Sequence, residues 1–468
     1  MVYSQIVVFF EQTGVNRITT TKPSVMQLNR RKFIKKTAAA SAVIGLTSVI
    51  PEQVWGSKVA PSDKINIALI GCRNFGNKIL RDHLGFNDTN CVAMCDVDSG
   101  ILNERAEAIR KDYGQNPRLY SDFRKMLEQN DIDAVIISTP DHWHCIQMVY
   151  SLQAGKDVYV EKPLANTIGE CNIMVKAARH YNRVVQVGQQ QRSNQAFQES
   201  IRLVNDGTAG KLRKVNVWGN FNYGLGTDFR DDEPVPEGVD YDMWLGPAPE
   251  RPFNRSRFHG SWRHYWDYGG GLMSDWGVHL IDMGLWAGDL TDAPREVMTF
   301  ATNNSAQQRQ RETFDTMTVV YPNKDFVINW DMTAGVEKGP WGKSYGAAFI
   351  CDNATIVTDR HSYQVIPEWD NAARIHKANA KHLTGFREAH PAHVRNFLDC
   401  IKTRETPVCP TETARAAAIH VHVPNIAARV GESLLVWDDK NSRFTNSQKA
   451  NELVTPVYRA PWKLPEIG

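Results

Sequence analysis

Apolar strand patterns alternate with amphipathic helix patterns between residues 64 and 188. The strands are predicted in KINIALIG (64–71), NCVAMCDVD (90–98), AVIISTP (134–140), DVYV (157–160) and RVVQVG (183–188). The segments between them are mostly of a length that single helices fill, and glycine or proline residues separate many of them. Strands that alternate with helices form βαβ units and a parallel sheet. The pattern therefore predicts an α/β domain with ligands at the carboxyl ends of its strands.

A different pattern begins near residue 210. Alternating strand patterns follow one another with few helices between them, in KVNVWGNF (214–221), TMTVVYP (316–322), FVINWDM (326–332), AAFICDNATIVTD (347–359) and SYQVIP (362–367). Such a series predicts an α+β domain built on a largely antiparallel sheet. An aromatic-rich, Pro/Gly-broken stretch at 241–271 is expected to be a long functional loop. Late helices at about 389–430 are expected, and they could pack back on the first domain.

The N-terminal region differs in charge from the rest of the chain. Residues 1–56 carry seven Lys and Arg but only two acids, which leaves 47 basic and 50 acidic residues elsewhere. A mildly acidic body argues against nucleic acid as a partner. The stretch NRRKFIKKTAAASAVIGLTSVIP (29–51) is typical of a twin-arginine export signal, although a basic amphipathic helix is the alternative. Its apolar run is too short to span a bilayer, so we expect a periplasmic protein without a membrane anchor.

The eight cysteines show no metal-binding or redox pattern. There is no Cys-x-x-Cys pair and no Cys/His cluster with zinc spacing. Cys91 and Cys95 are four positions apart in a predicted strand, about 13 Å, which is too far for a disulfide. Cys400 and Cys409 are close enough in sequence to pair, and most of the thiols are typical of small core residues.

The first strand leads into a turn with the context of a dinucleotide-binding fingerprint. The turn reads Gly71-Cys72-Arg73-Asn74-Phe75-Gly76, with Arg73 where the usual pattern has its second glycine. Asp96 ends the second strand 20 residues after Gly76, where a carboxylate accepts hydrogen bonds from ribose hydroxyls and repels a 2′-phosphate. The turn therefore predicts NAD rather than NADP, with an ordinary βαβ turn as the structural alternative.

Two further strand ends are expected to border the same cofactor. STPDHWH (138–144) ends one strand, and EKP (161–163) ends the next. Glu161 is predicted to point to the nicotinamide ribose and Lys162 to the reacting carbon. The other predicted cofactor contacts at strand ends are Thr139, Pro140, His142, Trp143, His144 and Gln189.

A helix pattern after a glycine run carries the candidate acid–base residues. In GGGLMSDWGVHLID (269–282), Asp275, His279 and Asp282 are spaced i, i+4 and i+7, which places them on one helical face. A carboxylate one turn before a histidine can orient the ring and tune its pKa. A structural histidine is the common alternative, and an Asp/His/Asp metal site is a second one, although hydride transfer needs no metal.

Taken together, these motifs resemble the glucose–fructose oxidoreductase / inositol dehydrogenase / MocA family from about Lys64 onwards. The resemblance implies an N-terminal Rossmann domain, an open-faced sheet domain and a homodimer or homotetramer formed partly through that sheet. It maps the family's catalytic residues onto Lys162, Asp275 and His279. The expected divisions are a signal region at 1–60, an NAD-binding Rossmann domain at 61–188 and a substrate-binding and oligomerisation domain at 189–468.

The resemblance implies an oxidoreductase that transfers a hydride between NAD(P) and a hydroxyl of a sugar, glycoside or polyol. His279 would take the hydroxyl proton, Asp275 would orient His279, and Lys162 would stabilise the oxygen. Half of the aromatic candidates for sugar contact are expected to be core instead. The expected substrate contacts are Arg192, Trp262, Arg263, His264, Tyr265, Asp267, Tyr268, Asp275 and His279.

Two other functions remain open at this point. An NAD-dependent glycosidase of the same fold would oxidise C3 transiently and eliminate the aglycone. The glycosidase branch has a histidine-containing loop before the glycine run, and this sequence shows no confident match to it. A non-catalytic carbohydrate binder is the third hypothesis, and the intact Lys162, Asp275 and His279 argue against it.

Overall fold

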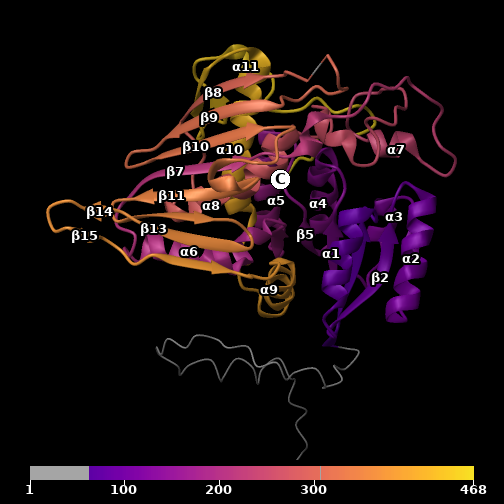
Figure 1. The fold of residues 1–468 in the computed structure, drawn as a ribbon. Helices are drawn as coiled ribbons and strands as arrows, with labels where there is room; N and C mark the ends of the chain where they lie inside the picture. The colour runs from indigo at the N-terminus through magenta and orange to yellow at the C-terminus, as the bar shows by residue number, and fades with distance from the viewer. Residues whose placement is uncertain (1–62, 306) are drawn as a thin grey trace, which may run out of the picture. The chain divides into compact units, whose positions relative to one another are not determined.

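The computed structural model describes residues 63–305 and 307–468, and Figure 1 shows their arrangement. The stretch expected to be a twin-arginine signal lies outside the described residues. Within the part that the structure describes, no helix combines the length and apolar character needed to cross a bilayer.

The first sheet is wholly parallel and six-stranded, in the order β3-β2-β1-β4-β5-β6. This is the Rossmann arrangement, in which successive strands are added outwards from β1 in one direction and then from β4 in the other, so that a crevice opens at the carboxyl ends of β1 and β4. Its strands are β1 (Ile65–Ile70), β2 (Thr89–Cys95), β3 (Arg118–Tyr120), β4 (Ala134–Ile137), β5 (Asp157–Val160) and β6 (Val185–Val187). Its helices are α1 (Asn74–Leu84), α2 (Ser99–Tyr113), α3 (Phe123–Leu127), α4 (His144–Gln153) and α5 (Ile168–Tyr181).

The second sheet has ten strands in the order β16-β13-β12-β11-β7-β10-β9-β8-β17-β18. Its pairings are antiparallel except for β7 with β10. The strands are β7 (Leu212–Gly219), β8 (Glu296–Thr302), β9 (Thr316–Pro322), β10 (Val327–Thr333), β11 (Tyr345–Cys351), β12 (Ala354–Thr358), β13 (Ser362–Pro367), β16 (Lys381–Thr384), β17 (Leu434–Asp438) and β18 (Arg443–Phe444). A separate short hairpin pairs β14 (Trp369–Asp370) with β15 (Ile375–His376).

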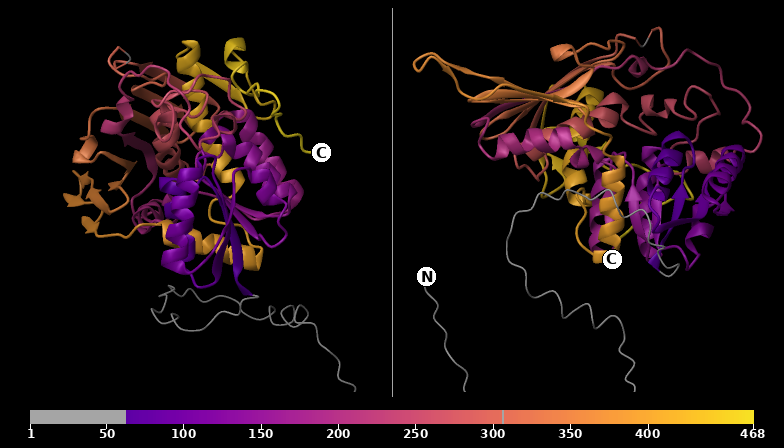
Figure 2. Two further views of the ribbon diagram at one scale, coloured as in Figure 1. Left: turned by 90° about the vertical axis from the view of Figure 1, so that its right-hand side faces the viewer. Right: turned by 60° about the horizontal axis from the view of Figure 1, so that its bottom comes forward.

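Helices cover one face of this sheet, as the edge-on view in Figure 2 shows. They are α6 (Gln195–Asn205), α8 (Val278–Ala287) and α10 (Thr411–Val430), and their apolar faces form one core with the strands. Strands β8 to β10 alternate between buried and more accessible residues, and Phe300 on the uncovered face is 65% exposed. The sheet is therefore open-faced, with mixed polar and apolar side chains on its free side.

The late helices pack against the Rossmann domain as well. Helix α9 (His390–Thr403) contacts α1, and α10 contacts α5. The ring of His393 on α9 lies 3.0 Å from the Val187 carbonyl oxygen at the end of β6. Arg395 of α9 forms an ion pair with Asp88, which lies just before β2. The late helices thus add to the cores on both sides of the first sheet, α9 to the side of α1 and α10 to the side of α5.

Residues 226–268, here called the covering segment, cross from the second domain to the first. The segment contains α7 (Tyr241–Leu245), which lies beside the Rossmann helices in Figure 1. The Asp240 backbone nitrogen donates to the Val97 carbonyl oxygen at 2.9 Å, and Ser99 donates to Gly238 at 2.9 Å. The segment is thereby fixed to the loop after β2, where the ribose-binding carboxylate Asp96 is expected.

The C-terminal tail supports the covering segment from behind. The Arg459 Nε donates to the Gly246 carbonyl oxygen at 3.1 Å. The ring of Trp462 packs edge-on against Trp143, with 4.8 Å between their centroids. Helix α11 (Gln448–Asn451) precedes this tail.

All eight cysteines are buried and unpaired. The pairing of Cys400 with Cys409, left open by the sequence, is absent. Cys400 on α9 belongs to the core on one side of the Rossmann sheet, whereas Cys409 belongs to the core on its other side.

Candidate active site

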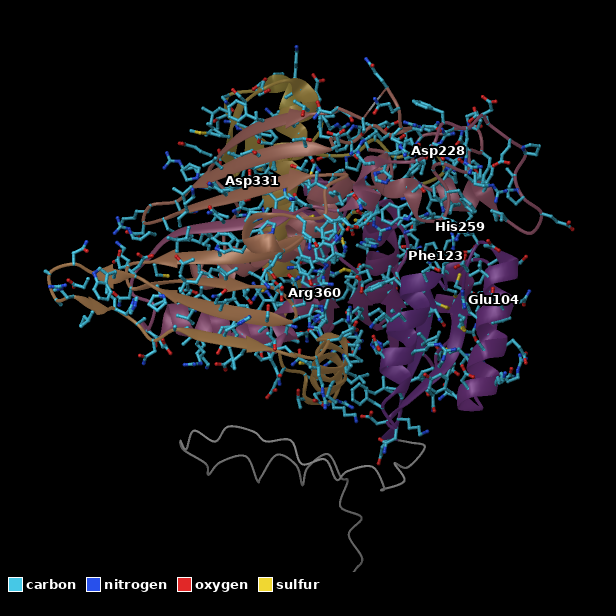
Figure 3. The ribbon with its side chains drawn as sticks, viewed as in Figure 1. Glu104, Phe123, Asp228, His259, Asp331 and Arg360 are labelled. Carbon is cyan, nitrogen blue, oxygen red and sulfur yellow. The ribbon has the colours of Figure 1, made fainter. Side chains whose placement is uncertain are left out.

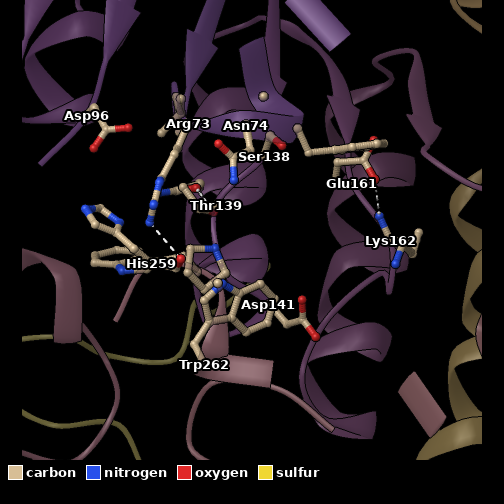
Figure 4. A pocket seen from close by; sticks show the side chains of 18 of the residues that line it. Arg73, Asn74, Asp96, Ser138, Thr139, Asp141, Glu161, Lys162, His259 and Trp262 are labelled. Carbon is tan, nitrogen blue, oxygen red and sulfur yellow. Dashed lines mark hydrogen bonds between the residues drawn. The ribbon is translucent and has the colours of Figure 1, made fainter. Parts of the chain in front are cut away.

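A cavity of about 460 Å³ lies where the carboxyl ends of the Rossmann strands meet the second domain and the covering segment. Figure 4 shows it with Asp96 at one end and Lys162 at the other. Fifteen of the residues predicted for cofactor, substrate or catalysis line it: Gly71, Arg73, Asn74, Phe75, Gly76, Asp96, Thr139, Pro140, Trp143, Glu161, Lys162, Trp262, Arg263, Asp275 and His279.

The turn after β1 is built so tightly that only glycine fits at its two ends. Gly71 has φ +88°, and a Cβ atom there would lie 2.7 Å from the Ser138 carbonyl oxygen. A Cβ on Gly76 would lie 1.9 Å from the Gly71 carbonyl oxygen. This cradle leaves backbone exposed at the amino end of α1, which is the geometry that binds a pyrophosphate.

Arg73 occupies the position of the missing middle glycine without disturbing this cradle. Its φ is −78°, an ordinary value for any residue, and its side chain turns toward the covering segment. The Arg73 Nη1 donates to the His259 carbonyl oxygen at 2.7 Å. The arginine therefore ties the first domain to the covering segment at the adenosine end of the cavity.

Asp96 is fixed by backbone donors. The Cys72 nitrogen donates to Oδ2 at 2.7 Å, and the Asp98 nitrogen donates to Oδ1 at 3.0 Å. These bonds use one lone pair on each oxygen and leave others for ribose hydroxyls. The glycine cradle and this carboxylate together fit an NAD molecule.

The middle of the cavity contains an unsatisfied carboxyl group. Glu161 is 4% exposed, and its Oε1 is buried with no hydrogen-bond partner. Burial raises the pKa of Glu161 to about 7. An orphaned buried oxygen of this kind indicates a missing partner, and the hydroxyl of a nicotinamide ribose matches that need.

Lys162 and Asp275, from different domains, are bound together at the far end. The Lys162 Nζ donates to the Asp275 backbone oxygen at 2.9 Å and forms an ion pair with the carboxylate of the same residue. Tyr223 donates to Asp275 Oδ2 at 3.0 Å, and the Arg263 Nε lies 3.2 Å from Oδ1. Although burial alone would raise the pKa of Asp275, the two cations hold it well below its usual range. Asp275 is therefore a fixed anion.

His279 lies in the same cavity but is held differently from the sequence-based expectation. Asp275 was expected to orient its ring, yet no hydrogen bond joins the two side chains. The physical reason is that Met273–Gly277 forms a π-helical turn before α8, so the i, i+4 spacing of an α-helix does not apply. Burial, together with the charges of Lys162 and Arg360, pushes the pKa of His279 well below its ordinary value, so the ring is neutral.

Asp282 also lies apart from the other two. It forms a bidentate ion pair with Arg192, at 2.6 and 2.8 Å, beneath the site. Arg192 was predicted to bind substrate, but this pair and its contact with the ring of Trp286 place it outside the cavity. Within residues 63–305 and 307–468, no three His, Cys, Asp or Glu side chains gather as a metal site would require.

Several other predicted site residues are packed behind the cavity wall. The two ring nitrogens of His144 lie 2.9 and 3.1 Å from the backbone oxygens of Pro163 and Thr139, and the one that carries the proton donates to its neighbour. The His142 Nε2 lies 3.2 Å from the Trp244 carbonyl oxygen, and the Gln189 side chain is fully buried. The cysteine in the cofactor turn contributes only its backbone nitrogen to Asp96. These side chains stabilise the loops that form the cavity.

The aromatic loop divides between cavity and core. Trp262 and Arg263 line the cavity, whereas Tyr265 and Tyr268 belong to the aromatic core of the covering segment. Asp267 lies 2.5 Å from Arg251 in an ion pair. His264 is buried and is not among the residues that line the cavity. Trp262 also belongs to this aromatic core, so all three aromatic rings are core side chains and Trp262 alone among them lines the cavity as well.

Other lining residues were missed by the sequence analysis. Asp141 is 5% exposed, and burial raises its pKa to about 8. Its place in the TPDHWH stretch was a usable signal. The remaining lining residues come from separate loops with no shared pattern, and they include Gln190, Met243, Trp244, His259, Trp276, Arg360 and His390.

Comparison with known proteins agrees with this architecture. Residues 65–189 match the family model of the Gfo/Idh/MocA oxidoreductase family with an NAD-binding Rossmann fold. Residues 165–356 and 370–464 match the model of the C-terminal alpha/beta domain of the same oxidoreductase family.

Curated relatives align only in part. A family 109 glycosyl hydrolase of Shewanella pealeana is 32% identical over 171 residues, which is 33% of this chain and 37% of that protein. An alpha-N-acetylgalactosaminidase of Shewanella oneidensis is 29% identical over 162 residues, 31% of this chain and 35% of that protein. The chain thus spans well under half the length of these relatives.

Solved structures share the fold. An aldose-aldose oxidoreductase of Caulobacter crescentus, complexed with glycerol, has a TM-score of 0.61 and 17% identity, covering 80% of this chain and 99% of that one. A levoglucosan dehydrogenase complexed with NADH and levoglucosan has a TM-score of 0.62 and 17% identity over the same shares. The two family models together cover most of the described residues. The chain therefore belongs to the Gfo/Idh/MocA oxidoreductase family and carries its NAD-binding Rossmann domain.

Proposed function

We propose that this protein is an NAD-dependent oxidoreductase that acts on a hydroxyl group of a sugar, glycoside or polyol. The observation that carries the proposal is the meeting of Lys162 and His279, one from each domain, at the end of a dinucleotide cavity opposite to Asp96. The dehydrogenases of sugars among the structural neighbours share this fold.

The chain would hold NAD through the cradle at Gly71 and Gly76, through Asp96 at the adenosine ribose and through Glu161 at the nicotinamide ribose. When bound, the nicotinamide supplies the chemistry of accepting a hydride from the carbon that bears the hydroxyl. All other parts of the reaction belong to side chains of the protein.

His279 takes the proton of the substrate hydroxyl. Its Nδ1 is buried without a partner, so Nε2 is the nitrogen that meets the cavity. The neutral state of the ring leaves that nitrogen free to accept a proton. Lys162 donates a hydrogen bond to the same substrate oxygen and stabilises the negative charge that develops there. Asp275 fixes the Lys162 ammonium group in position through its ion pair.

The sugar would lie against Trp262 and beside Tyr223 and Trp276. The Trp276 Nε1 donates to the Tyr223 hydroxyl, which in turn donates to Asp275. Aromatic faces cover the C–H surface of a sugar, while the polar groups around them bind its hydroxyls. Oxidation of a glycoside at C3 fits this arrangement.

We place the reaction in the periplasm, after export through the twin-arginine route. That route carries folded proteins, so NAD can be loaded before export, and free NAD is scarce outside the cytosol. A held cofactor would then be recycled in place by a second sugar or another acceptor. We also propose a homodimer or homotetramer formed through the open face of the ten-stranded sheet.

A second candidate function is an NAD-dependent glycosidase of the same fold. It is favoured by the similarity of part of the chain to family 109 glycosyl hydrolases. Asp141 also supports the glycosidase function. A carboxyl group with a pKa of about 8 stays protonated at neutral pH and can protonate a leaving group. Products distinguish the two functions, since an oxidoreductase yields a keto-sugar and a glycosidase releases the aglycone.

The test is a mass spectrum of products from a panel of sugars and glycosides, for the wild type and for Lys162→Met. We expect a keto-sugar from the wild type and a rate about 10²- to 10³-fold lower for the variant, the usual cost of losing one oxyanion donor. Lys211→Met, on the exposed side of the second domain, is the matched control and should keep full activity. Undiminished turnover by Lys162→Met would refute the assigned role.

A further inference from the structure

Arg360 is a cation at the substrate end of the cavity that the proposed reaction does not use. It lies in the turn between β12 and β13, and Figure 3 labels it where the ten-stranded sheet faces the Rossmann domain. Arg360, Gln190 and His390 line both the main cavity and a smaller adjoining one of about 90 Å³. The side chain therefore stands at the junction of two spaces open to a ligand.

The turn that presents Arg360 is held rigidly. Asp359 Oδ1 accepts from the backbone nitrogens of His361 and Ser362, both at 2.8 Å. Lys343 holds the other oxygen of Asp359 at 2.6 Å. The Asn194 Nδ2 donates to the Arg360 carbonyl oxygen at 3.0 Å. A binding group fixed in this way loses little entropy when a ligand arrives.

The guanidinium has no carboxylate partner. Among the described residues, no Asp or Glu oxygen lies within 4.0 Å of its nitrogens. The nearby acids are occupied, because Glu388 pairs with Lys78 and Asp275 with Lys162. An arginine stays charged when it is partly buried, so no directly paired carboxylate neutralises this charge. Such a group is costly unless a ligand supplies the counter-charge.

Aromatic rings orient the guanidinium toward the cavity. Its central carbon lies 4.6 Å from the Trp276 ring centroid and 5.8 Å from that of Tyr345. Stacking covers a face of the planar group and leaves its N–H edges for in-plane acceptors. Arg360 thus offers one planar fork and one positive charge, which a single carboxylate matches.

The contacts of Arg360 connect it to the catalytic end of the cavity. Trp276, on which it stacks, lies 6.0 Å from the His279 ring. Gln191, with its amide oriented to satisfy both neighbours, bridges the two: it donates to the His279 carbonyl oxygen at 2.8 Å and accepts from Arg360 Nε at 3.1 Å. The cation therefore lies beside His279, where the substrate hydroxyl is expected.

We propose that the substrate is an acidic sugar whose carboxylate binds Arg360, a uronic acid or its glycoside. The inference rests on the proposed function and narrows its substrate class. A hexuronate differs from the neutral hexose only at C6, so the sugar ring still meets Trp262 and the Lys162 and His279 pair. The carboxylate replaces the missing counter-ion of Arg360.

The experiment is calorimetric titration of the full protein, saturated with NADH, with two matched pairs of ligands. These are methyl glucuronide against methyl glucoside, and methyl galacturonide against methyl galactoside. In at least one pair the acidic sugar should bind about 10- to 100-fold more tightly, the range for a charge-assisted hydrogen bond pair. Arg360→Gln should remove that preference, and Arg360→Lys should keep part of it.

Arg213→Gln is the matched control, because Arg213 is an exposed arginine of β7 that pairs with Asp352. It should leave the preference unchanged, and a melting curve of Arg360→Gln checks that the variant is folded. Equal binding of acidic and neutral sugars, binding of neither, or a preference that survives Arg360→Gln overturns the inference.

The products of the same sugars distinguish this inference from the proposed function. Arg360-dependent binding of a uronide that is never oxidised would keep Arg360 as a carboxylate-binding residue but remove the proposed function, and with it the uronide as a substrate. Equal binding and equal oxidation of neutral and acidic glycosides would keep the function and remove the inference.

Discussion

Asp275 binds Lys162 rather than His279, and this choice of partner gives the two basic groups different surroundings. Lys162 forms an ion pair with the Asp275 carboxylate, which also accepts a hydrogen bond from Tyr223. His279 is 3% exposed and has no carboxylate bound to its ring. One group is therefore a fixed donor and the other a neutral acceptor, which is the division of labour that removal of a hydroxyl proton requires.

The pH profile of activity should reflect the neutral state of His279. Burial and the neighbouring Lys162 disfavour the imidazolium, so the pKa lies well below the ordinary value of 6.5. Because protonation is delayed to lower pH, the base remains active as pH falls from 7 to 5.5. At saturating NAD, so that protonation of Glu161 does not limit cofactor binding, we expect kcat/KM for a sugar found in the product panel to stay nearly constant across that range.

An acid limb with an apparent pKa near 6.5 would contradict this assignment of the base. Substitution of His361 by Gln serves as the control, because this histidine lies next to Arg360 in sequence and outside the main cavity. Its loss should leave the pH profile unchanged.

Local constraints made some site residues predictable. The roles of Gly71 and Gly76 were predictable because the backbone approaches closely at both positions. The roles of Asp96 and Lys162 were predictable because both residues come at the carboxyl ends of strands. The predicted hydrogen bond from Asp275 to His279 is absent, and its absence was not predictable because the sequence does not reveal the π-helical turn. Arg360 was not predictable either, since its role depends on a turn between two strands that reaches another domain.

At the scale of the element, the amino end of α6 couples stability to the site. Asn194 Oδ1 accepts from the Ala196 and Phe197 nitrogens, at 3.0 and 3.3 Å, while its Nδ2 holds Arg360. Asn194→Ala should lower the free energy of unfolding by about 1 to 2 kcal/mol, the usual cost of a lost cap. Chemical denaturation measures this loss.

Asn194→Ser separates the two roles of this residue. Serine still caps a helix but is too short to reach the Arg360 carbonyl oxygen. We expect near-normal stability, with any preference for acidic sugars reduced. If Asn194→Ser lost as much stability as Asn194→Ala, the cap would not be the source of the effect.

The covering segment should control release of the cofactor. The His259 Nε2 lies 2.7 Å from Asp98 Oδ2, which fixes the segment to the start of α2 beside Asp96. His259→Ala keeps the backbone oxygen that binds Arg73 but removes this contact. We expect NADH to leave about tenfold faster, which corresponds to ~1.4 kcal/mol. Stopped-flow fluorescence with an excess of unlabelled NAD measures the rate.

His376→Ala, on the distant exposed strand β15, is the control for that measurement and should release NADH at the wild-type rate. An unchanged rate in His259→Ala would mean that the segment does not limit exit of the cofactor.

The covering segment is also a region in which the sequence cannot predict which aromatic side chains line the cavity. Its aromatic residues have similar neighbours in sequence, yet Trp262 lines the cavity and Tyr268 is fully buried. Composition predicts that such a loop is functional, but only tertiary packing decides which ring faces the ligand. Strands β8 and β17 were not predicted from the sequence for a related reason. They pair with each other although they lie far apart in the sequence, so the pairing leaves no local pattern.

At the scale of the whole molecule, the free face of the ten-stranded sheet should mediate assembly. Phe300 is 65% exposed there, and its neighbours Met298 and Leu434 are 42% and 40% exposed. We expect light scattering to show a dimer or tetramer for the wild type and a smaller particle for Phe300→Glu, because a charge disfavours burial of this patch.

Phe229→Glu is the matched control, because Phe229 is 61% exposed but lies in the covering segment. It should not change the mass. A monomeric wild type, or an oligomer unaffected by Phe300→Glu, would remove the free face as the interface.

The general architecture was predictable because helix and strand periods differ along the chain. The parallel sheet followed from alternation, and the antiparallel one from strands in succession. The parallel pairing of β7 with β10 was not visible, since it joins segments more than a hundred residues apart. Long-range pairings of this kind depend on packing in three dimensions and have no local signal.

The support of the covering segment by Arg459 and Trp462 has a consequence for biosynthesis. During translation, Gly71 and Asp96 leave the ribosome long before Arg459 and Trp462, the tail residues that support the covering segment over the adenosine end of the cavity. A nascent chain can therefore form the first sheet early, but its adenosine pocket stays unroofed until the tail has emerged. Capture of the dinucleotide becomes a late, post-translational event, and a ribosome stalled before residue 459 would release a polypeptide that folds its strands yet retains no nucleotide.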